Sequence, residues 1–247
     1  MSVNKVAVVT GGASGIGKAI SQQLAQEGVA VSVWDLNADA TQATVDEIVA
    51  AGGQAIGCVG DAADKAAIAD NAQKTREAFG AITILVNNAG ITGFIPFLEI
   101  DEETVDRILR INVKGPLLCC QEMIPDMLEA GWGRIVNVTS SSAQTGAARM
   151  VHYATSKGGV MSMTKSLAME YADKGITVNN IPPGFIDTPM MRASPIGAAL
   201  DQVIAASPMK RAGQPEDIAA ACSYLVSDAA AYVTGQTINV NGGRYIC

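Results

Sequence analysis

A tyrosine and a lysine stand four residues apart in the segment YATSK, as Tyr153 and Lys157. Residues at this spacing share one face of a helix, so the phenol and the ammonium would point the same way. A free tyrosine has a pKa of about 10, which is too high for a base at neutral pH. Because a neighbouring cation favours the phenolate, the pair predicts a lowered tyrosine pKa and a proton exchanged with a bound hydroxyl or carbonyl oxygen.

Taken alone, this spacing most often means an exposed tyrosine and lysine on an ordinary amphipathic helix. His152, the only histidine, is a rival acid or base, and we interpret it as a pocket-lining or loop residue. One histidine and five cysteines at scattered spacings cannot supply the ligands of a zinc site, so no metal is expected. The cysteines are expected to be reduced and mostly buried.

A glycine-rich turn, TGGASGIG at residues 10–17, follows an apolar stretch and opens a helical pattern. Gly11, Gly15 and Gly17 would let the backbone turn sharply and approach a pyrophosphate at the positive N-terminus of that helix. The spacing differs from the common G-x-G-x-x-G pattern of dinucleotide sites, and a plain strand-to-helix turn is the alternative.

Asp35 ends the second apolar run, 18 residues after Gly17. A carboxylate at this place can accept hydrogen bonds from both adenosine ribose hydroxyls, and it would repel a ribose 2'-phosphate. Neither the glycine turn nor the segment DLN supplies an arginine or lysine to neutralise that phosphate. The sequence therefore predicts NAD(H) in preference to NADP(H). Asp61, after the third run, would bind the adenine edge or cap the next helix.

Seven short apolar runs alternate with longer helical patterns along the chain. Continuous apolar runs between helices are typical of a parallel sheet covered on both faces. The sequence thus predicts an α/β fold of the Rossmann type, doubly wound, with a seven-stranded parallel sheet. The runs are KVAVVT, VAVSVW, AIGCVG, ITILVNN, GRIVNVTS, GITVNNI and GQTINVN, and helices are expected at 15–28, 37–51, 64–79, 101–130, 151–174 and 215–227.

Length and composition favour one globular domain over residues 1–247, with an irregular segment at about 184–211 as a substrate lid. The net charge of -7, without a basic cluster, argues against nucleic acid as a partner. No apolar run approaches the roughly 20 residues that span a bilayer, and no signal peptide is apparent. We therefore expect a cytoplasmic protein without a membrane partner.

Five short motifs follow one another along the chain: TGGASGIG, NNAG at 87–90, Asn112 in INVKG, Ser140 in VTSSS, and YATSK. Together they resemble the short-chain dehydrogenase/reductase family, in its compact single-domain branch. The resemblance runs from Lys5 to Gly243 and implies that Asn112, Ser140, Tyr153 and Lys157 are catalytic. The main chain of Asn112 would hold a water next to Lys157. Ser140, 13 residues before Tyr153, would hydrogen-bond the reacting oxygen.

The resemblance also implies the cofactor contacts. Asn87 would steady the central sheet, Lys157 would bind the nicotinamide ribose, and Thr188 and the main chain of Ile186 would contact the carboxamide. Asn241 replaces the aspartate usual before the last GG, so contacts near the C-terminus are expected to differ. The residues expected to bind the cofactor are Gly11, Ser14, Gly15, Ile16, Gly17, Asp35, Leu36, Asp61, Ala62, Asn88, Ala89, Gly90, Tyr153, Lys157, Pro183, Gly184, Ile186 and Thr188.

Substrate contacts are expected from three mostly apolar segments, at 91–97, 141–152 and 184–200. Their composition predicts a hydrophobic or alicyclic secondary alcohol or ketone as the small-molecule substrate. The residues expected to bind it are Ser140, Ser142, Met150, Tyr153, Phe185, Met190 and Met191, with Phe94 as a further lining residue.

The predicted function is that of an NAD(H)-dependent alcohol dehydrogenase or carbonyl reductase. One alternative is a 3-oxoacyl-thioester reductase that acts on acyl carrier protein with NADPH, against which Asp35 and the acidic net charge argue. Another is a non-catalytic nucleotide-binding sensor or scaffold, which would not need Tyr153 and Lys157. The resemblance further implies a homotetramer, with the helices that hold Asn112 and Tyr153 at its interface, and a dimer is the alternative.

Overall fold

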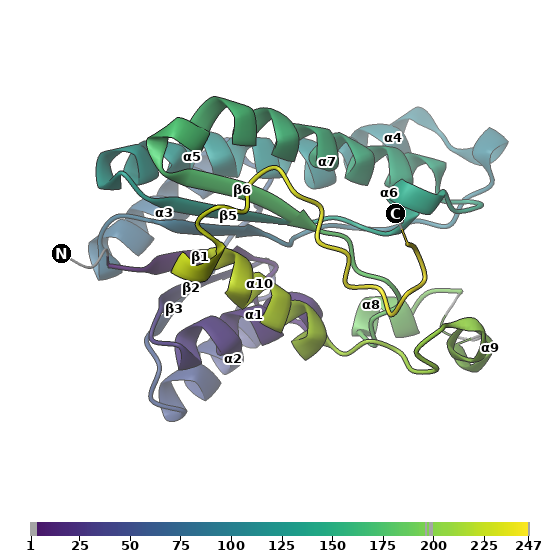
Figure 1. Cartoon of the computed structure of the whole chain (residues 1–247), viewed down its shortest axis with the longest axis horizontal. Helices are drawn as coiled ribbons and strands as arrows, with labels where there is room; N and C mark the ends of the chain where they lie inside the picture. Colours follow the sequence, from purple (N-terminus) through teal and green to yellow (C-terminus); the bar gives the residue numbers. More distant parts are fainter. Residues whose placement is uncertain (1–3, 196, 198–199, 247) are drawn as a thin grey trace.

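One parallel β-sheet organises the computed structural model, which describes residues 4–195, 197 and 200–246 (Figure 1). The strand order is β3-β2-β1-β4-β5-β6. All the strands except β3 are almost wholly buried, which explains why they read as unbroken apolar runs. The strands are β1 (Val6–Thr10), β2 (Ala30–Asp35), β3 (Ala55–Val59), β4 (Ile84–Asn87), β5 (Gly133–Val138) and β6 (Ile176–Ile181).

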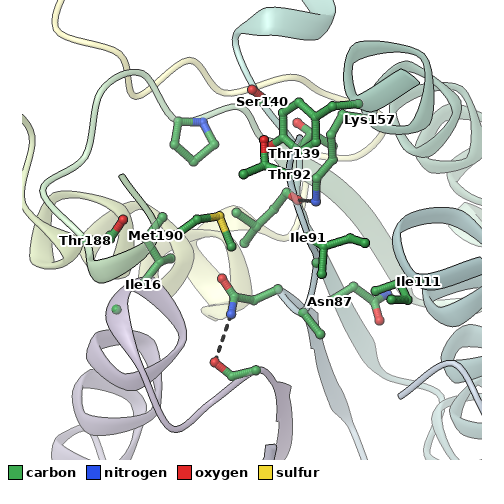
Figure 2. Close-up of a pocket in the computed structure, with 18 of the residues that line it drawn as sticks. Ile16, Asn87, Ile91, Thr92, Ile111, Thr139, Ser140, Lys157, Thr188 and Met190 are labelled. Carbon is green, nitrogen blue, oxygen red and sulfur yellow. Dashed lines mark hydrogen bonds between the residues drawn. The ribbon is translucent and has the colours of Figure 1, made fainter. Parts of the chain in front are cut away.

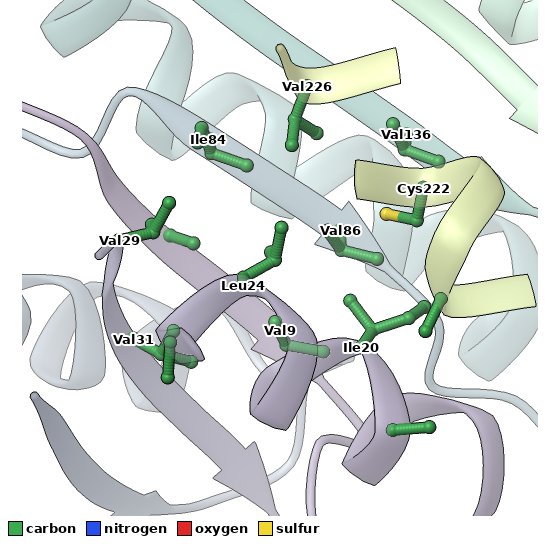
Figure 3. Packing of buried hydrophobic residues seen from close by; sticks show 14 of the residues in the cluster. Val9, Ile20, Leu24, Val29, Val31, Ile84, Val86, Val136, Cys222 and Val226 are labelled. Carbon is green, nitrogen blue, oxygen red and sulfur yellow. The ribbon is translucent and has the colours of Figure 1, made fainter. Parts of the chain in front are cut away.

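Helices cover both faces of the sheet (Figure 1). On one face, α1 (Gly15–Gln26), α2 (Ala38–Ala50) and α10 (Pro215–Val226) share an apolar cluster with the strands, in which Leu24 and Cys222 meet β1 and β4 (Figure 3). On the other face, α3 (Lys65–Phe79), α5 (Gly115–Ala130) and α7 (Val151–Tyr171) form a second cluster that includes Met123. The doubly wound α/β prediction is confirmed.

The order in which strands are added to the sheet reverses at β1, although all the strands are parallel. Strands β2 and β3 lie on one side of β1, and β4 to β6 lie on the other. Thr10, the last residue of β1, pairs with Trp34 of β2 and with Asn87 of β4. In open α/β sheets the crevice at the carboxyl ends of the strands beside such a reversal is where ligands bind. The glycine turn, Asp35 and NNAG all follow strands at this edge.

The prediction of a seventh strand is wrong. Residues 235–240 run beside β6, where the Gly235 amide donates to Val178 and the Ile238 amide donates to Asn180, but they form only isolated bridges. The reason is that side chains take several of the ladder's main-chain partners. Asn179 bonds the carbonyl of Val233 and the amide of Gln236, and the Thr234 hydroxyl accepts from the Val178 amide. The sheet therefore has six strands.

The helix predicted at 101–130 is present in extent but is not uniform. It consists of α4 (Glu102–Leu109), a π-helical turn η2 (Arg110–Lys114) and α5. Pro116 has no N–H to donate to the carbonyl of Asn112, four residues earlier, and the Gly115 amide instead donates to Arg110, five residues earlier. The π-turn therefore frees the main-chain oxygen of Asn112 from the usual helical bond.

Short helices also occur where the sequence predicted loops. They are α6 (Ser142–Thr145), the 3-10 turns η1 (Phe97–Glu99) and η5 (Asp228–Ala230), and, within the expected lid, α8 (Pro189–Arg192) and α9 (Leu200–Ala206). The helix predicted to 174 ends as α7 at Tyr171 and continues as a 3-10 turn, η3 (Ala172–Lys174). Residues 196 and 198–199 of the lid lie outside the described residues.

Four of the five cysteines, Cys58, Cys119, Cys120 and Cys222, are free and buried, in line with their prediction as buried thiols. Cys247 lies outside the described residues. Across the described part of the chain, none of the helices combines the length and the apolar character that crossing a membrane requires.

Candidate active site

A cavity of about 480 Å³ opens at the carboxyl edge of the sheet, beside the reversal at β1 (Figure 2). The glycine turn, Asp35 and the NNAG segment line it, and so do Ser140, Tyr153 and the start of the lid. Of the residues that the sequence assigns to catalysis, cofactor or substrate, all line this cavity except Gly17 and Asn112, which are buried directly behind it.

Tyr153 and Lys157 stand one turn apart on α7, and both line the cavity. Lys157 is 6% exposed, and its Nζ donates to the carbonyl oxygen of Val138 at 3.0 Å. Burial lowers the pKa of Lys157 from its ordinary 10.5 to about 8. The pKa of Lys157 therefore lies close to neutral pH, where a small change in its surroundings would release its proton.

The pKa of Tyr153 is raised in the protein alone, whereas the lowered pKa predicted from the sequence is that of a tyrosine next to both the lysine and the positive nicotinamide of NAD+. Burial raises it above the ordinary value of 10, and a hydrogen bond with the Ser140 side chain lowers it by a smaller amount. The ammonium of Lys157 donates to the Val138 carbonyl rather than to Tyr153. In the protein alone, Tyr153 is therefore a protonated acid, and its Ser140 partner also shares a 2.8 Å hydrogen bond with Ser142.

Asn112 is fully buried in the π-turn, and its side chain makes three hydrogen bonds. Its Oδ1 accepts from the Ile91 amide, and its Nδ2 donates to the Ile91 carbonyl and to the Ser156 hydroxyl, all at 2.9–3.0 Å. Ser156 in turn donates to the carbonyl of Tyr153. The side-chain amide of Asn112 thus ties the strand-end loop to α7.

Gly90 allows the approach of Asn112 and Lys157 to each other. A Cβ at position 90 would lie 3.1 Å from the Asn112 Oδ1 and 3.2 Å from the Lys157 Nζ. Both distances are tighter than ordinary carbon contacts, so any side chain here would push one of the two polar groups aside. The glycine at the end of NNAG therefore has a packing role next to the lysine.

Asn87 links the middle of the sheet to α7, as the resemblance implied. Its Nδ2 donates to the Asn137 side chain at 2.9 Å, and Asn137 donates to the Thr164 hydroxyl at the same distance. These buried amides fix β4, β5 and the helix that carries Tyr153 relative to one another. The Asn87 Oδ1 is buried and without a partner among the described residues.

Close backbone packing shapes the glycine turn. Gly11 and Gly15 have positive φ angles of 62° and 48°, and a Cβ on Gly17 would lie on the carbonyl oxygen of Gly11. The Asn88 side chain donates to the carbonyls of Thr10 and Gly11 at 3.1 Å each. This arrangement leaves an open backbone turn at the N-terminus of α1, where the positive end of the helix can meet a pyrophosphate.

Thr10 also supports this turn, although the sequence analysis did not single it out. Its hydroxyl accepts hydrogen bonds from the amides of Asn88 and Ala89 at 3.1 Å each. The available signal was its position as the last residue of a buried strand, directly before the glycines. Thr10 thereby joins the glycine turn to the NNAG segment across the reversal point.

Two carboxylates line the region next to the glycine turn. Asp35 accepts from the amides of Ala13 at 3.3 Å and Asn37 at 3.1 Å, so it is held in place and keeps acceptor capacity for a ligand. Asp61 accepts from the Ala63 amide and pairs with Arg110 at 2.8 Å. Asp64, rather than Asp61, caps α3. No lysine or arginine contacts Asp35 within the described residues.

These features fit a nicotinamide dinucleotide: a glycine turn for the pyrophosphate, an aspartate after β2 for a ribose diol, and Lys157 next to Tyr153.

The lid also reaches the glycine turn. Thr188 caps α8, and its Cγ2 lies 3.4 Å from where a Cβ of Gly15 would be. Ile186 bridges Gly213 in the main chain, and Figure 2 shows Thr188, Met190 and Ile16 close together at the cavity wall.

The residues expected to contact substrate form an apolar wall of the cavity. Met150, Phe185, Met190 and Met191 line it, together with Phe94. Met150 is 8% exposed, whereas Met190 is 50% exposed at the lid surface. The cavity can therefore bind an apolar body next to the Ser140 and Tyr153 hydroxyls.

His152 is neither a cavity-lining nor a loop residue, contrary to the sequence prediction. It lies in the first turn of α7 with 6% exposure, and its ring packs against Gly93. Burial lowers its pKa below 6.5, and neither ring nitrogen has a hydrogen-bond partner among the described residues. His152 therefore does not compete with Tyr153 for the proton transfer.

Comparisons with known proteins agree with this geometry. A family model described as "Enoyl-(Acyl carrier protein) reductase" matches residues 11–244. The chain is 41% identical to the (2S)-[(R)-hydroxy(phenyl)methyl]succinyl-CoA dehydrogenase subunit BbsD of Thauera aromatica, over 98% of this chain and 96% of that protein. It is 39% identical to the 3-oxoacyl-[acyl-carrier-protein] reductase FabG of Staphylococcus epidermidis, over 99% of this chain and all of that protein.

A solved structure is also similar over almost the whole chain. A crystal structure of an actinorhodin polyketide ketoreductase variant with NADPH has a TM-score of 0.93 and 34% sequence identity. The similarity covers 99% of this chain and all of that one. All three of these relatives are named as dehydrogenases or reductases.

Proposed function

The chain belongs to the short-chain dehydrogenase/reductase family, and from that premise we propose that it is an NAD(H)-dependent oxidoreductase that interconverts a hydrophobic secondary alcohol and its ketone. The observation that carries the proposal is the convergence of Ser140, Tyr153 and Lys157 on the cavity that the glycine turn and Asp35 also line. A binding protein needs the turn and the aspartate, but it has no use for a buried acid and a buried ammonium beside them.

The nicotinamide supplies the hydride acceptor for alcohol oxidation and the hydride donor for ketone reduction. Tyr153, which is protonated in the protein alone, would donate a proton to the carbonyl oxygen during reduction, and positive charge next to the phenol would favour the phenolate that remains. Ser140 holds the same oxygen by a hydrogen bond that strengthens as charge develops. Lys157 would hold a ribose hydroxyl of a bound dinucleotide and would supply positive charge near Tyr153. The main-chain carbonyl of Asn112 would hold a water through which a proton returns to Lys157.

The cofactor preference is proposed from Asp35. Its carboxylate would bond the ribose hydroxyls of NAD(H) and would repel the 2'-phosphate of NADP(H). Of the cations that line the cavity, Arg110 is paired with Asp61, Lys157 donates to the Val138 carbonyl, and Arg244 stacks on Phe185, so none of them forms an ion pair with Asp35. The similar ketoreductase structure contains NADPH, so the preference needs a direct test.

Asp35→Ser should shift the preference from NADH towards NADPH by about tenfold to a hundredfold in kcat/KM. The reason is that one charge-assisted hydrogen bond contributes about 1.5–3 kcal/mol, and the repulsion of the phosphate disappears with it. The measurement is steady-state kinetics with both reduced cofactors. Asp39→Ser is the control, since Asp39 is exposed in the first turn of α2 and does not line the cavity. An unchanged ratio in Asp35→Ser would show that another residue selects the cofactor.

A second candidate function is the reduction of 3-oxoacyl thioesters with NADPH. The names of the relatives favour it, because one is a 3-oxoacyl-[acyl-carrier-protein] reductase and another acts on a CoA thioester. The acidic net charge of -7 is less suited to an acidic carrier protein. The apolar wall of Phe185, Met190 and Met191 is compatible with either substrate.

A panel of ketones separates the candidates. The purified protein is assayed with NADH and NADPH against cyclohexanone, acetophenone and acetoacetyl-CoA. We expect turnover of a simple ketone with NADH. A preference for acetoacetyl-CoA with NADPH would replace the proposal by the second candidate, and dinucleotide binding without turnover of any ketone would indicate a non-catalytic protein.

We also propose that the protein is a homotetramer. Apolar side chains that nothing covers in the single chain lie on α5 and α7, where Leu117 is 41%, Leu128 41% and Met169 86% exposed. Exposed apolar side chains on neighbouring long helices are suited to burial against a second copy. Light scattering coupled to size-exclusion chromatography should give four times the 25.5 kDa chain mass, and a monomer would refute the assembly.

A further inference from the structure

Arg244 is a cation whose role the proposed chemistry does not explain. It lines the cavity beside Phe185, and it also lines a second hollow between residues 204–213 and the C-terminal segment. Its guanidinium carbon lies 3.8 Å from the centroid of the Phe185 ring. No carboxylate of the described residues forms an ion pair with it. The other arginines of this region, Arg192 and Arg211, are paired with Asp187 and Asp217.

The backbone around Arg244 is held in a defined turn. The Asn241 Oδ1 accepts from the Gly243 amide at 3.0 Å, its Nδ2 donates to the carbonyl of Tyr245 at 3.1 Å, and the Arg244 amide donates to the Asn241 carbonyl. An aspartate could accept the first bond but could not donate the second. The asparagine that departs from the family pattern therefore clasps the chain on both sides of Arg244.

The same turn is packed against the start of the lid. A Cβ on Gly184 would lie 2.8 Å from the Asn241 Cα, so only glycine lets the two segments approach this closely. Gly184 precedes Phe185, whose ring Arg244 covers. Stacking on an aromatic ring and attachment to a fixed turn restrict the conformations of the Arg244 side chain. Less conformational entropy is then lost when its N–H groups bind a ligand.

Among the described cations that line the cavity, Arg244 is the one without a polar partner. The lining between residues 140 and 153 and between 183 and 194 contains no acidic or basic side chain. Arg110 and Lys157, the other two cations of the lining, already have partners. An apolar wall with one unpaired guanidinium is complementary to an apolar molecule that carries one oxyanion.

We propose that Arg244 binds a carboxylate on the substrate, so that the natural substrate is a hydrophobic hydroxy acid or oxo acid. This inference rests on the proposed function and narrows its substrate class. Arg244 would select and orient the substrate through an end remote from Ser140 and Tyr153. The planar fork of the guanidinium matches a carboxylate with two parallel hydrogen bonds, and the Phe185 ring under the guanidinium holds it in place.

The test compares an acid with its neutral ester. Affinities of 4-ethylbenzoate and methyl 4-ethylbenzoate are measured by calorimetry with NAD+ present, and kcat/KM is measured for 4-acetylbenzoate and its methyl ester. Arg244→Met should weaken binding of the acid about tenfold to a hundredfold, and should change the ester less than about twofold. The kinetic loss should fall mainly on KM, because Arg244 does not touch the reacting oxygen. Arg244→Lys should recover part of the affinity.

Two further variants sharpen the test. Lys65→Met removes the same unit of charge from the exposed start of α3, outside both hollows, and should leave binding of the acid unchanged. Asn241→Asp keeps Arg244 but loses the bond to Tyr245 and adds a negative charge, and should also weaken binding of the acid. Thermal unfolding of each variant confirms that the protein is folded.

The proposal is overturned if the wild-type protein binds the acid no better than the ester, or if Arg244→Met weakens both ligands equally. It is also overturned if the effect appears only with acetoacetyl-CoA and not with its N-acetylcysteamine thioester, because the anion would then be a phosphate of the carrier. Failure of the proposed function has a different signature: the acid binds and responds to Arg244→Met, but no ketone is reduced.

Discussion

Tyr153→Phe should lower kcat for ketone reduction by about a thousandfold while leaving the dissociation constant of NADH nearly unchanged. The ring remains to fill its place in the cavity wall, and only the hydroxyl is lost. Without that hydroxyl, Ser140 still holds the carbonyl oxygen but nothing donates a proton to it. The measurements are stopped-flow or steady-state turnover with NADH, and titration of NADH fluorescence for binding.

The control for Tyr153→Phe is Tyr224→Phe, which removes a hydroxyl from a half-exposed tyrosine of α10 that does not line the cavity. It should have close to wild-type turnover. Near wild-type turnover in Tyr153→Phe itself would remove the proposed acid. A joint loss of turnover and NADH binding would instead show that the phenol is needed to shape the nucleotide site.

Lys157→Met should abolish most turnover and at the same time stabilise the protein in the absence of a dinucleotide. At pH 7 the folded protein must hold a buried ammonium whose pKa has fallen from 10.5 to about 8, which costs about 3 kcal/mol. Removal of the lysine relieves this cost, but it also removes the hydrogen bond to Val138, which stabilises the folded protein by about 1 kcal/mol. The free energy of unfolding in urea should therefore rise by about 2 kcal/mol.

The pH dependence gives this prediction a definite sign. Below about pH 8 the lysine is charged in both the folded and the unfolded protein, so burial of the ammonium destabilises the folded protein by the full amount. Between about pH 8 and 10.5 the folded protein releases its proton first, so the wild-type protein gains stability as the pH rises and the advantage of Lys157→Met shrinks.

Lys165→Met is the matched control, because Lys165 is an exposed lysine on the same helix. Its removal should change stability by less than about 0.5 kcal/mol at any pH in this range. A destabilised Lys157→Met, or a stability difference that does not vary between pH 8 and 10.5, would show that Lys157 is not a strained cation in the free protein.

Much of the fold could be predicted from the sequence because a buried parallel sheet leaves a strong local signal. The runs that became β1 and β4 are fully buried, and an apolar run bounded by glycine or asparagine is recognisable without any tertiary information. The segment around Thr237 carries the same local signal, yet it forms no regular strand. Its hydrogen bonds depend on the side chains of Asn179 and Asn180, which belong to another part of the chain.

The site shows the same division. Placement of Tyr153, Lys157 and Asp35 follows from helix periodicity and strand ends, and the structure brings all three to one cavity. The direction of the Tyr153 pKa could not be predicted, because it depends on how deeply the ring is buried and on which oxygen Lys157 faces. Arg244 was missed for a related reason: only the folded chain shows that its stacking partner, 59 residues earlier, is Phe185.

The π-turn at Arg110–Lys114 contains one residue more than an α-helix would use to cover the same axial length. Deletion of one residue there would let α4 and α5 merge into an uninterrupted α-helix. It would rotate α4 by about 100° relative to α5 around the helix axis. Asn112 would then face away from Ile91 and Ser156. Evolutionary changes of chain length should therefore accumulate in surface turns such as 51–54, whereas the interrupted helix has to be inherited at constant length.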